Sequence, residues 1–82
     1  FQAGRLEEVG GSMRYAIVIE RTDNNYSAYV PDLPGCVAAG ATLAETEVAI
    51  REAIAFHIEG MHEDGLPIPV ASSQVEYIEV AA

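Results

Sequence analysis

The strongest constraint on how this chain folds is a short stretch rich in proline and glycine, followed closely by a helix-start signal. The stretch reads Val30-Pro31-Asp32-Leu33-Pro34-Gly35-Cys36, and the signal reads Thr42-Leu43-Ala44-Glu45. Proline cannot donate a hydrogen bond to a sheet, so Pro31 ends any strand before it. The Thr-x-x-Glu pattern caps a helix, because the hydroxyl and the carboxylate each accept a bond from a free backbone N–H. We therefore predict a rigid corner and a helix cap formed by Pro31, Asp32, Pro34, Gly35 and Thr42.

Hydrophobic patterning on either side of the corner predicts the order strand, strand, strand, helix, strand. The first strand is a continuous apolar and β-branched run, which is typical of a central strand buried on both faces. A polar cluster at residues 22–25 predicts a turn after it. The last stretch is read as alternating polar and apolar residues, which predicts a half-exposed strand. The predicted strands cover residues 14–20, 26–30, 36–39 and 74–80, and the predicted helix runs from 43 to about 62.

The predicted helix has an apolar face and an acidic face. At about 100° per residue, the apolar face collects Leu43, Ile50, Ile54 and Met61, flanked by His57 and Ile58. The opposite face collects Glu45, Glu52, Glu59 and Glu63. Phe56 projects close to the acidic face, and Val48 also lies off the apolar face. One helix covers only one face of a sheet, so self-association is the simplest way to cover the other.

Residues 1–12 are predicted to be foreign to the domain, because they resemble an expression-tag remnant that ends in Gly10-Gly11-Ser12 before Met13. We therefore expect a single domain over residues 13–82. Removing the net charge of −1 of residues 1–12 from the total of −9 leaves −8, and the chain has no lysine. Such acidity disfavours direct nucleic-acid binding, which relies on Lys and Arg, and favours a basic protein partner.

The candidate reactive side chains form no recognisable catalytic or metal-binding pattern. His57 and His62 lie about 140° apart around a helix, so they do not share a metal ion. His62-Glu63 lacks the second histidine of a zinc-protease motif. Cys36 has acidic and apolar neighbours, which favours a buried thiol over a nucleophile. We expect no cofactor and no metal, although an Mg²⁺ site on the acidic face is an alternative to a solvated helix surface.

The corner and the helix together resemble the HicB antitoxin family. The similarity runs from the aromatic-rich hairpin through residues 30–36 and the Gly-x-Thr-x-x-Glu entry at residues 40–45. It continues with Glu52-Ala53 and ends in Gly65-Leu66-Pro67-Ile68-Pro69, so it covers nearly all of residues 13–80. The resemblance implies a two-layer α+β domain with a partial ribonuclease-H-like fold. That fold is a three-stranded antiparallel meander, one helix, and a fourth strand beside the first.

The resemblance also implies a function. HicB proteins neutralise HicA, a small basic mRNA-cleaving toxin, by covering its active site. We therefore expect a non-catalytic, cytoplasmic, bacterial protein-binding module, which forms a homodimer and neither spans a membrane nor binds nucleic acid directly. The expected partner-binding residues are Glu45, Glu52, Phe56, Glu59 and Glu63.

Two alternatives stay open at this point. One is a solitary HicB-like regulatory or structural dimer without a toxin. The other is a degenerate metal-dependent nuclease that uses Asp32 and the helix carboxylates. The chain also departs from the family in having Glu45-Thr46 where Glu-Ala is typical. In addition, it ends at Ala82 without the DNA-binding domain that many members carry, so we do not expect it to bind an operator.

Overall fold

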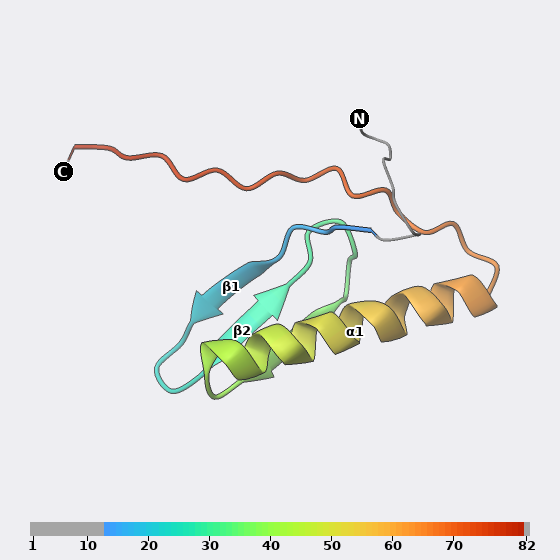
Figure 1. Ribbon diagram of the computed structural model, residues 1–82, viewed down its shortest axis with the longest axis horizontal. Coiled ribbons are helices and arrows are strands. Elements are labelled where there is room, and N and C mark those ends of the chain that lie inside the picture. The colour runs from blue at the N-terminus through green and yellow to red at the C-terminus, as the bar shows by residue number, and fades with distance from the viewer. Residues whose placement is uncertain (1–12, 82) are drawn as a thin grey trace.

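The chain forms a three-stranded antiparallel sheet followed by one helix, seen in a computed structural model that describes residues 13–81 (Figure 1). The predicted α+β class is confirmed by this order. The tag remnant predicted for residues 1–12 lies outside the described residues. The elements are β1 Val18–Arg21, β2 Tyr26–Tyr29, β3 Val37–Gly40 and α1 Leu43–Glu63, and β2 lies between β1 and β3 in the sheet.

A polar turn joins β1 to β2 and sets the register of the hairpin. The Thr22 N–H donates to the Asn25 carbonyl over 2.8 Å, and the Asn25 N–H donates to the Thr22 hydroxyl over 3.1 Å. In the resulting register Ile19 faces Ala28, which faces Ala38. Successive side chains of a strand point to opposite faces. This row lies on the side that α1 covers, because all three residues pack in or against the core.

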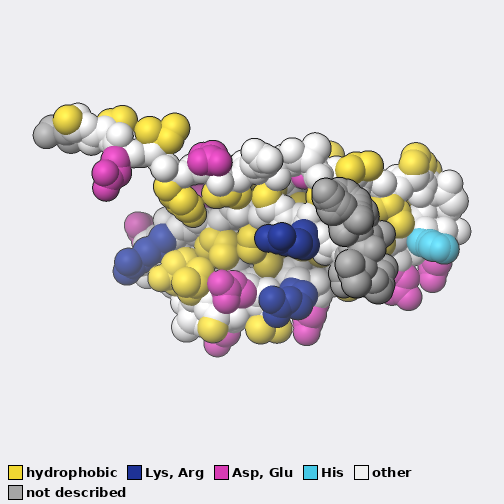
Figure 2. All heavy atoms as spheres, turned by 45° about the horizontal axis from the view of Figure 1, so that its top comes forward, with side chains coloured by type: hydrophobic (Ala, Val, Ile, Leu, Met, Phe, Trp, Pro, Cys, Tyr) yellow, Lys and Arg dark blue, Asp and Glu magenta, His cyan; other side chains and the backbone are white. Residues whose placement is uncertain are grey.

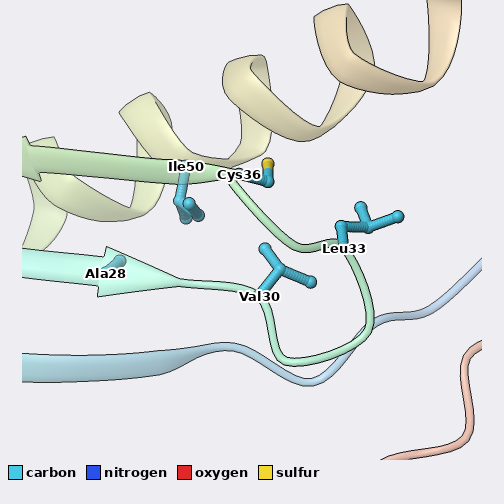
Figure 3. Packing of buried hydrophobic residues seen from close by; sticks show 5 residues of the cluster. All are labelled: Ala28, Val30, Leu33, Cys36 and Ile50. Atoms are coloured by element: carbon cyan, nitrogen blue, oxygen red, sulfur yellow. The ribbon is translucent and has the colours of Figure 1, made fainter. Parts of the chain in front are cut away.

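The proline–glycine corner consists of two consecutive turns. The Leu33 N–H donates to the Val30 carbonyl, and the Cys36 N–H donates to the Leu33 carbonyl, both over 3.0 Å. In the second turn Pro34 is followed by Gly35, whose φ is +85°. This is the type II arrangement, which needs a residue that tolerates positive φ. The corner buries Leu33 completely and brings Val30 and Cys36 beside it in the core (Figure 3).

The helix begins where the capping box predicts and lies close against β3. The Thr42 hydroxyl accepts a bond from the Glu45 N–H, and the Glu45 carboxylate accepts one from the Ala41 N–H, each over 3.1 Å. Gly40 permits the close approach, because a Cβ at this position would lie 2.8 Å from the Thr46 hydroxyl oxygen. Thr46 is itself buried and donates its hydroxyl hydrogen to the Thr42 carbonyl.

The core lies between α1 and the sheet. It consists of Ala28, Val30, Leu33, Cys36 and Ile50, with Ile17, Ile54 and Ile58 among the half-buried residues around it (Figure 3). The predicted apolar face of the helix is therefore confirmed at Ile50, Ile54 and Ile58. It is wrong at Leu43, which is 47% exposed. Leu43 lines a polar hollow together with residues of the β1–β2 turn, because the first turn of α1 lies beside that turn.

The helix ends in a Schellman motif that turns the chain away. The Leu66 N–H donates to the Met61 carbonyl over 2.9 Å, and the Gly65 N–H donates to the His62 carbonyl over 3.1 Å. Gly65 has a φ of +71°, the left-handed conformation that this motif requires. Beyond it, the C-terminal segment, defined as residues 66–81, contains no helix and no strand.

The fourth strand predicted at residues 74–80 is not formed in the described chain. Residues 70–81 are exposed, and the segment runs apart from the sheet (Figure 1). The prediction of a central first strand is wrong for the same reason. With no neighbour on its second side among residues 13–81, β1 is an edge strand, half-buried at Val18 and Ile19 and exposed at Glu20 and Arg21.

Candidate functional site: the acidic helix face and the corner

The outward face of α1 presents the acidic residues that the periodicity predicts. Glu45, Glu52, Glu59 and Glu63 are all exposed, and we call them the acidic face. Glu45 has a second role, because its carboxylate also caps the helix. Phe56 is 78% exposed, so it takes no part in the core of the monomer. Aromatic side chains are enriched in protein interfaces, so the exposed Phe56 makes this face a candidate contact surface.

A shallow hollow lies on the first half of the acidic face. It is lined by Ala44, Glu45, Val48, Ala49 and Glu52, so its floor is apolar and its rim carries two carboxylates. Long basic side chains combine an apolar stem with a charged head group. A lysine or arginine of another protein can therefore place its stem on this floor and its head group beside Glu45 or Glu52.

Asp32 connects the corner to the C-terminal segment. One of its carboxylate oxygens accepts the backbone N–H groups of Ser72 and Ser73, each over 3.0 Å. The other oxygen accepts their hydroxyl groups over 3.2 Å and 2.9 Å. The backbone N–H of Ser73 contributes most to holding the pKa of Asp32 below its ordinary value, because these bonds stabilise the charged form.

A second anchor of the C-terminal segment lies nearby. The Tyr15 hydroxyl donates to the carbonyl of Pro69 over 2.6 Å. Partial burial, with a smaller contribution from the charge of Asp32, raises the pKa of the Tyr15 hydroxyl, which stays protonated as this bond requires. Sequence reasoning missed both anchors. No local pattern links residues 40 or more positions apart, such as Asp32 and the Ser72-Ser73 pair.

The candidate reactive groups lie apart from one another. Cys36 is buried, as predicted, and burial raises the pKa of its thiol, which disfavours the nucleophilic thiolate. His57 is half-buried and His62 is exposed. Within residues 13–81 no three His, Cys, Asp or Glu side chains lie together as a metal-binding group. The oxygens of Asp32 contact serines of the C-terminal segment, so the structure does not bring this carboxylate together with those of the helix.

The face of the sheet opposite α1 is open. Val18, Tyr29 and Val37 lie side by side across the three strands. Tyr29 is 43% exposed and Val37 is 64% exposed. We call this row the open sheet face; the sequence predicts that such a face needs a cover, and the described residues supply none. The same residues contain no helix with the length and apolar character needed to cross a membrane.

Residues 15–81 match the model of a family described as the HicB-like antitoxin of bacterial toxin–antitoxin systems. The fold is also similar to a chain in a solved structure of the HicA3 and HicB3 toxin–antitoxin complex. The TM-score is 0.64 at 37% sequence identity, and the match covers 73% of this chain and 70% of that one. Because the identity is well above the level at which only a fold is shared, the structural likeness and the family match support each other.

Related sequences occur in a phage, a bacterium and an archaeon. The chain is 47% identical over 66 residues to an uncharacterized 14.9 kDa protein of Haemophilus phage HP1, and it spans about half, 50%, of that protein's length. It is 37% identical over 65 residues to a UPF0150 protein of Helicobacter pylori, of which it covers 90%. A UPF0150 protein of Thermoplasma acidophilum is 36% identical over 58 residues. With its sheet, corner and helix all inside the matched range, the chain belongs to the HicB-like antitoxin family.

Proposed function

We propose that this protein is a non-catalytic antitoxin that binds a small, basic, mRNA-cleaving toxin of the HicA type through the acidic face of α1. The observation that carries the proposal is the likeness to a chain of the HicA3 and HicB3 complex, combined with an exposed acidic helix face. The net charge of −9 supports the same partner, since opposite charge steers encounter and disfavours other acidic proteins. The proposal puts both proteins in the cytoplasm, where the toxin meets mRNA.

In the proposed complex the acidic face and Phe56 have different roles. The carboxylates of Glu52, Glu59 and Glu63 attract the toxin and receive its lysines and arginines, while the hollow beside Glu45 accepts one basic side chain. Phe56 supplies the apolar anchor, because buried aromatic residues carry much of the energy of protein interfaces. Neutralisation then follows from steric cover of the toxin's active site, with no chemical step by the antitoxin.

The test measures binding to a purified HicA-type toxin and protection of RNA from cleavage by it. The variant Glu52→Gln/Glu59→Gln should slow association and flatten its salt dependence, because it removes two charges from the acidic face. The variant Glu20→Gln/Asp23→Asn removes the same charge at the β1–β2 hairpin and serves as the matched control. Equal effects of the two variants would show that overall charge acts and not the acidic face.

A solitary dimer without a toxin is the second candidate, and the open sheet face favours it, because an apolar row of this kind invites a second copy. We propose that the single domain of residues 13–82 forms a homodimer in either case. A toxin gene beside the gene for this protein would count against the solitary candidate. RNA or DNA cleavage with Mg²⁺ that is abolished by Asp32→Asn would overturn both proposals and make the protein a nuclease.

A further inference from the structure

The stretch at residues 74–80 exposes large apolar side chains that nothing in the described chain covers. Tyr77 is 94% exposed and Ile78 is 82% exposed, and Val75 and Val80 are exposed as well. Figure 2 shows the C-terminal segment projecting beyond the body of the molecule with hydrophobic side chains along it. Leaving this much apolar surface in water is unfavourable, which indicates that the stretch has a binding partner.

The apolar residues of this stretch lie on both sides of an extended chain, so the half-exposed strand that the sequence predicts would leave part of them in water. In an extended chain successive side chains point in opposite directions. Val75 and Tyr77 therefore lie on one side, and Ile78 and Val80 lie on the other. Strands with apolar residues on both sides are typical of sheets whose two faces are covered. A single monomer offers one helix layer and leaves the other sheet face open, so it cannot cover both sides of such a strand.

The matching surface is the free edge of β1. Val18–Arg21 pairs with β2 on one side only within the described chain, so the other side presents unpaired backbone groups. Arg14 and Arg21 flank this edge and are exposed, whereas the stretch at residues 74–80 carries Glu76 and Glu79. Opposite charges on neighbouring strands favour pairing. Two of the chain's four arginines therefore lie at this edge, together with the exposed Glu20.

We propose that the protein forms a symmetric dimer in which residues 74–80 of each copy pair with the free edge of β1 of the other copy. The bonds from Ser72 and Ser73 to Asp32 fix the segment to its own corner, and the stretch that follows runs apart from its own sheet (Figure 1). Two-fold symmetry makes the contact twice, once at each β1 edge. The open sheet faces of the two copies, each with Val18, Tyr29 and Val37, then pack against each other and cover the side of each added strand that α1 does not reach.

The experiment uses the purified protein alone, so it does not depend on the toxin. Sedimentation equilibrium should give about twice the chain mass of 8.8 kDa. In a one-to-one mixture of isotope-labelled and unlabelled protein, isotope-filtered NMR should detect contacts between the Tyr77 ring of one copy and the β1 strand of the other. The variant Ile78→Ser should raise the dimer dissociation constant by about tenfold or more, because it removes a large apolar group from the new contact.

The matched control is Leu66→Ser, which makes the same change at an exposed residue of the segment outside the pairing stretch. Both variants should keep the circular dichroism spectrum of the folded monomer, because neither side chain belongs to the core. A monomer would overturn this inference together with the proposed homodimer. A dimer without contacts between Tyr77 and the other copy's β1, or one weakened equally by both variants, would overturn the strand exchange alone. Contacts of residues 74–80 with β1 of the same copy would overturn it as well.

Discussion

The corner at residues 30–36 and the C-terminal segment at residues 66–81 are held in place in opposite ways. The corner forms two turns, buries Leu33 completely and contributes Val30 and Cys36 to the core. The C-terminal segment contains no regular structure. Beyond the bond from Leu66 that closes the helix end, its hydrogen bonds to the rest of the described chain come from Pro69, Ser72 and Ser73. Apolar burial therefore stabilises the first region, whereas a few polar bonds orient the second and leave most of its apolar residues exposed.

The largest loss of stability is expected from a substitution in the corner. Leu33→Ala should lower the free energy of unfolding by about 2–5 kcal/mol, because it removes a fully buried side chain and leaves a cavity. Small domains have little stability to lose, so this variant should be largely unfolded. Val70→Ala in the C-terminal segment should change the free energy by less than about 0.5 kcal/mol, because Val70 is exposed. Urea denaturation of both variants measures the difference. Similar losses of stability would show that the C-terminal segment stabilises the fold as much as the corner does.

Alanine substitutions at two glycines should give the next largest changes in stability. The two changes should have opposite signs. Gly40→Ala should cost about 1–3 kcal/mol of stability, because the new Cβ would lie 2.8 Å from the Thr46 hydroxyl oxygen and push α1 from β3. Gly60→Ala should raise stability by about 0.5–1 kcal/mol, because alanine favours a helix interior and a Cβ there meets no atom within 4 Å. Thermal unfolding compares the two. If Gly40→Ala left the stability unchanged, α1 and β3 would have enough space between them for the added Cβ.

Phe56→Ala should separate binding from stability. Its side chain is 78% exposed, so truncation should change the free energy of unfolding by less than about 0.5 kcal/mol. The affinity for a HicA-type toxin should fall by about tenfold or more if Phe56 is the anchor of the interface. Calorimetric titration measures the affinity, and urea denaturation measures the stability. Unchanged affinity would remove Phe56 from the proposed site while leaving the acidic face to be tested.

Lowering the pH should have the smallest effect on the stability of the whole fold. The pKa of Asp32 is lower in the folded protein than in the unfolded chain, so this group contributes stability above the unfolded pKa of about 4. That contribution is lost as pH falls below this value and through the folded pKa. Protonation should release Ser72 and Ser73, and their amide NMR signals should shift in this acid range. In Asp32→Asn the same signals should show no such transition, and a transition that persisted there would assign it to another group.

Residues 36–65 illustrate what could be predicted from the sequence. The Thr-x-x-Glu box determines where α1 begins, because its bonds join residues three or four positions apart. Helix periodicity likewise places the acidic face and Phe56 on the outside, since rotation per residue is a local property. Leu43 is the exception, because its exposure depends on the β1–β2 turn beside it. The angular position of a residue on a helix does not say which other segments lie next to that residue.

The corner, the order of the three strands, the two faces of the helix and the family resemblance can all be predicted from the sequence. All of these follow from turn chemistry and periodicity, which act over a few residues. Three other features are seen first in the folded chain: β1 is an edge strand, Asp32 binds Ser72 and Ser73, and residues 74–80 lie outside the sheet. These features depend on which distant segments meet, and that is settled by burial and geometry of the whole chain and not by any local pattern.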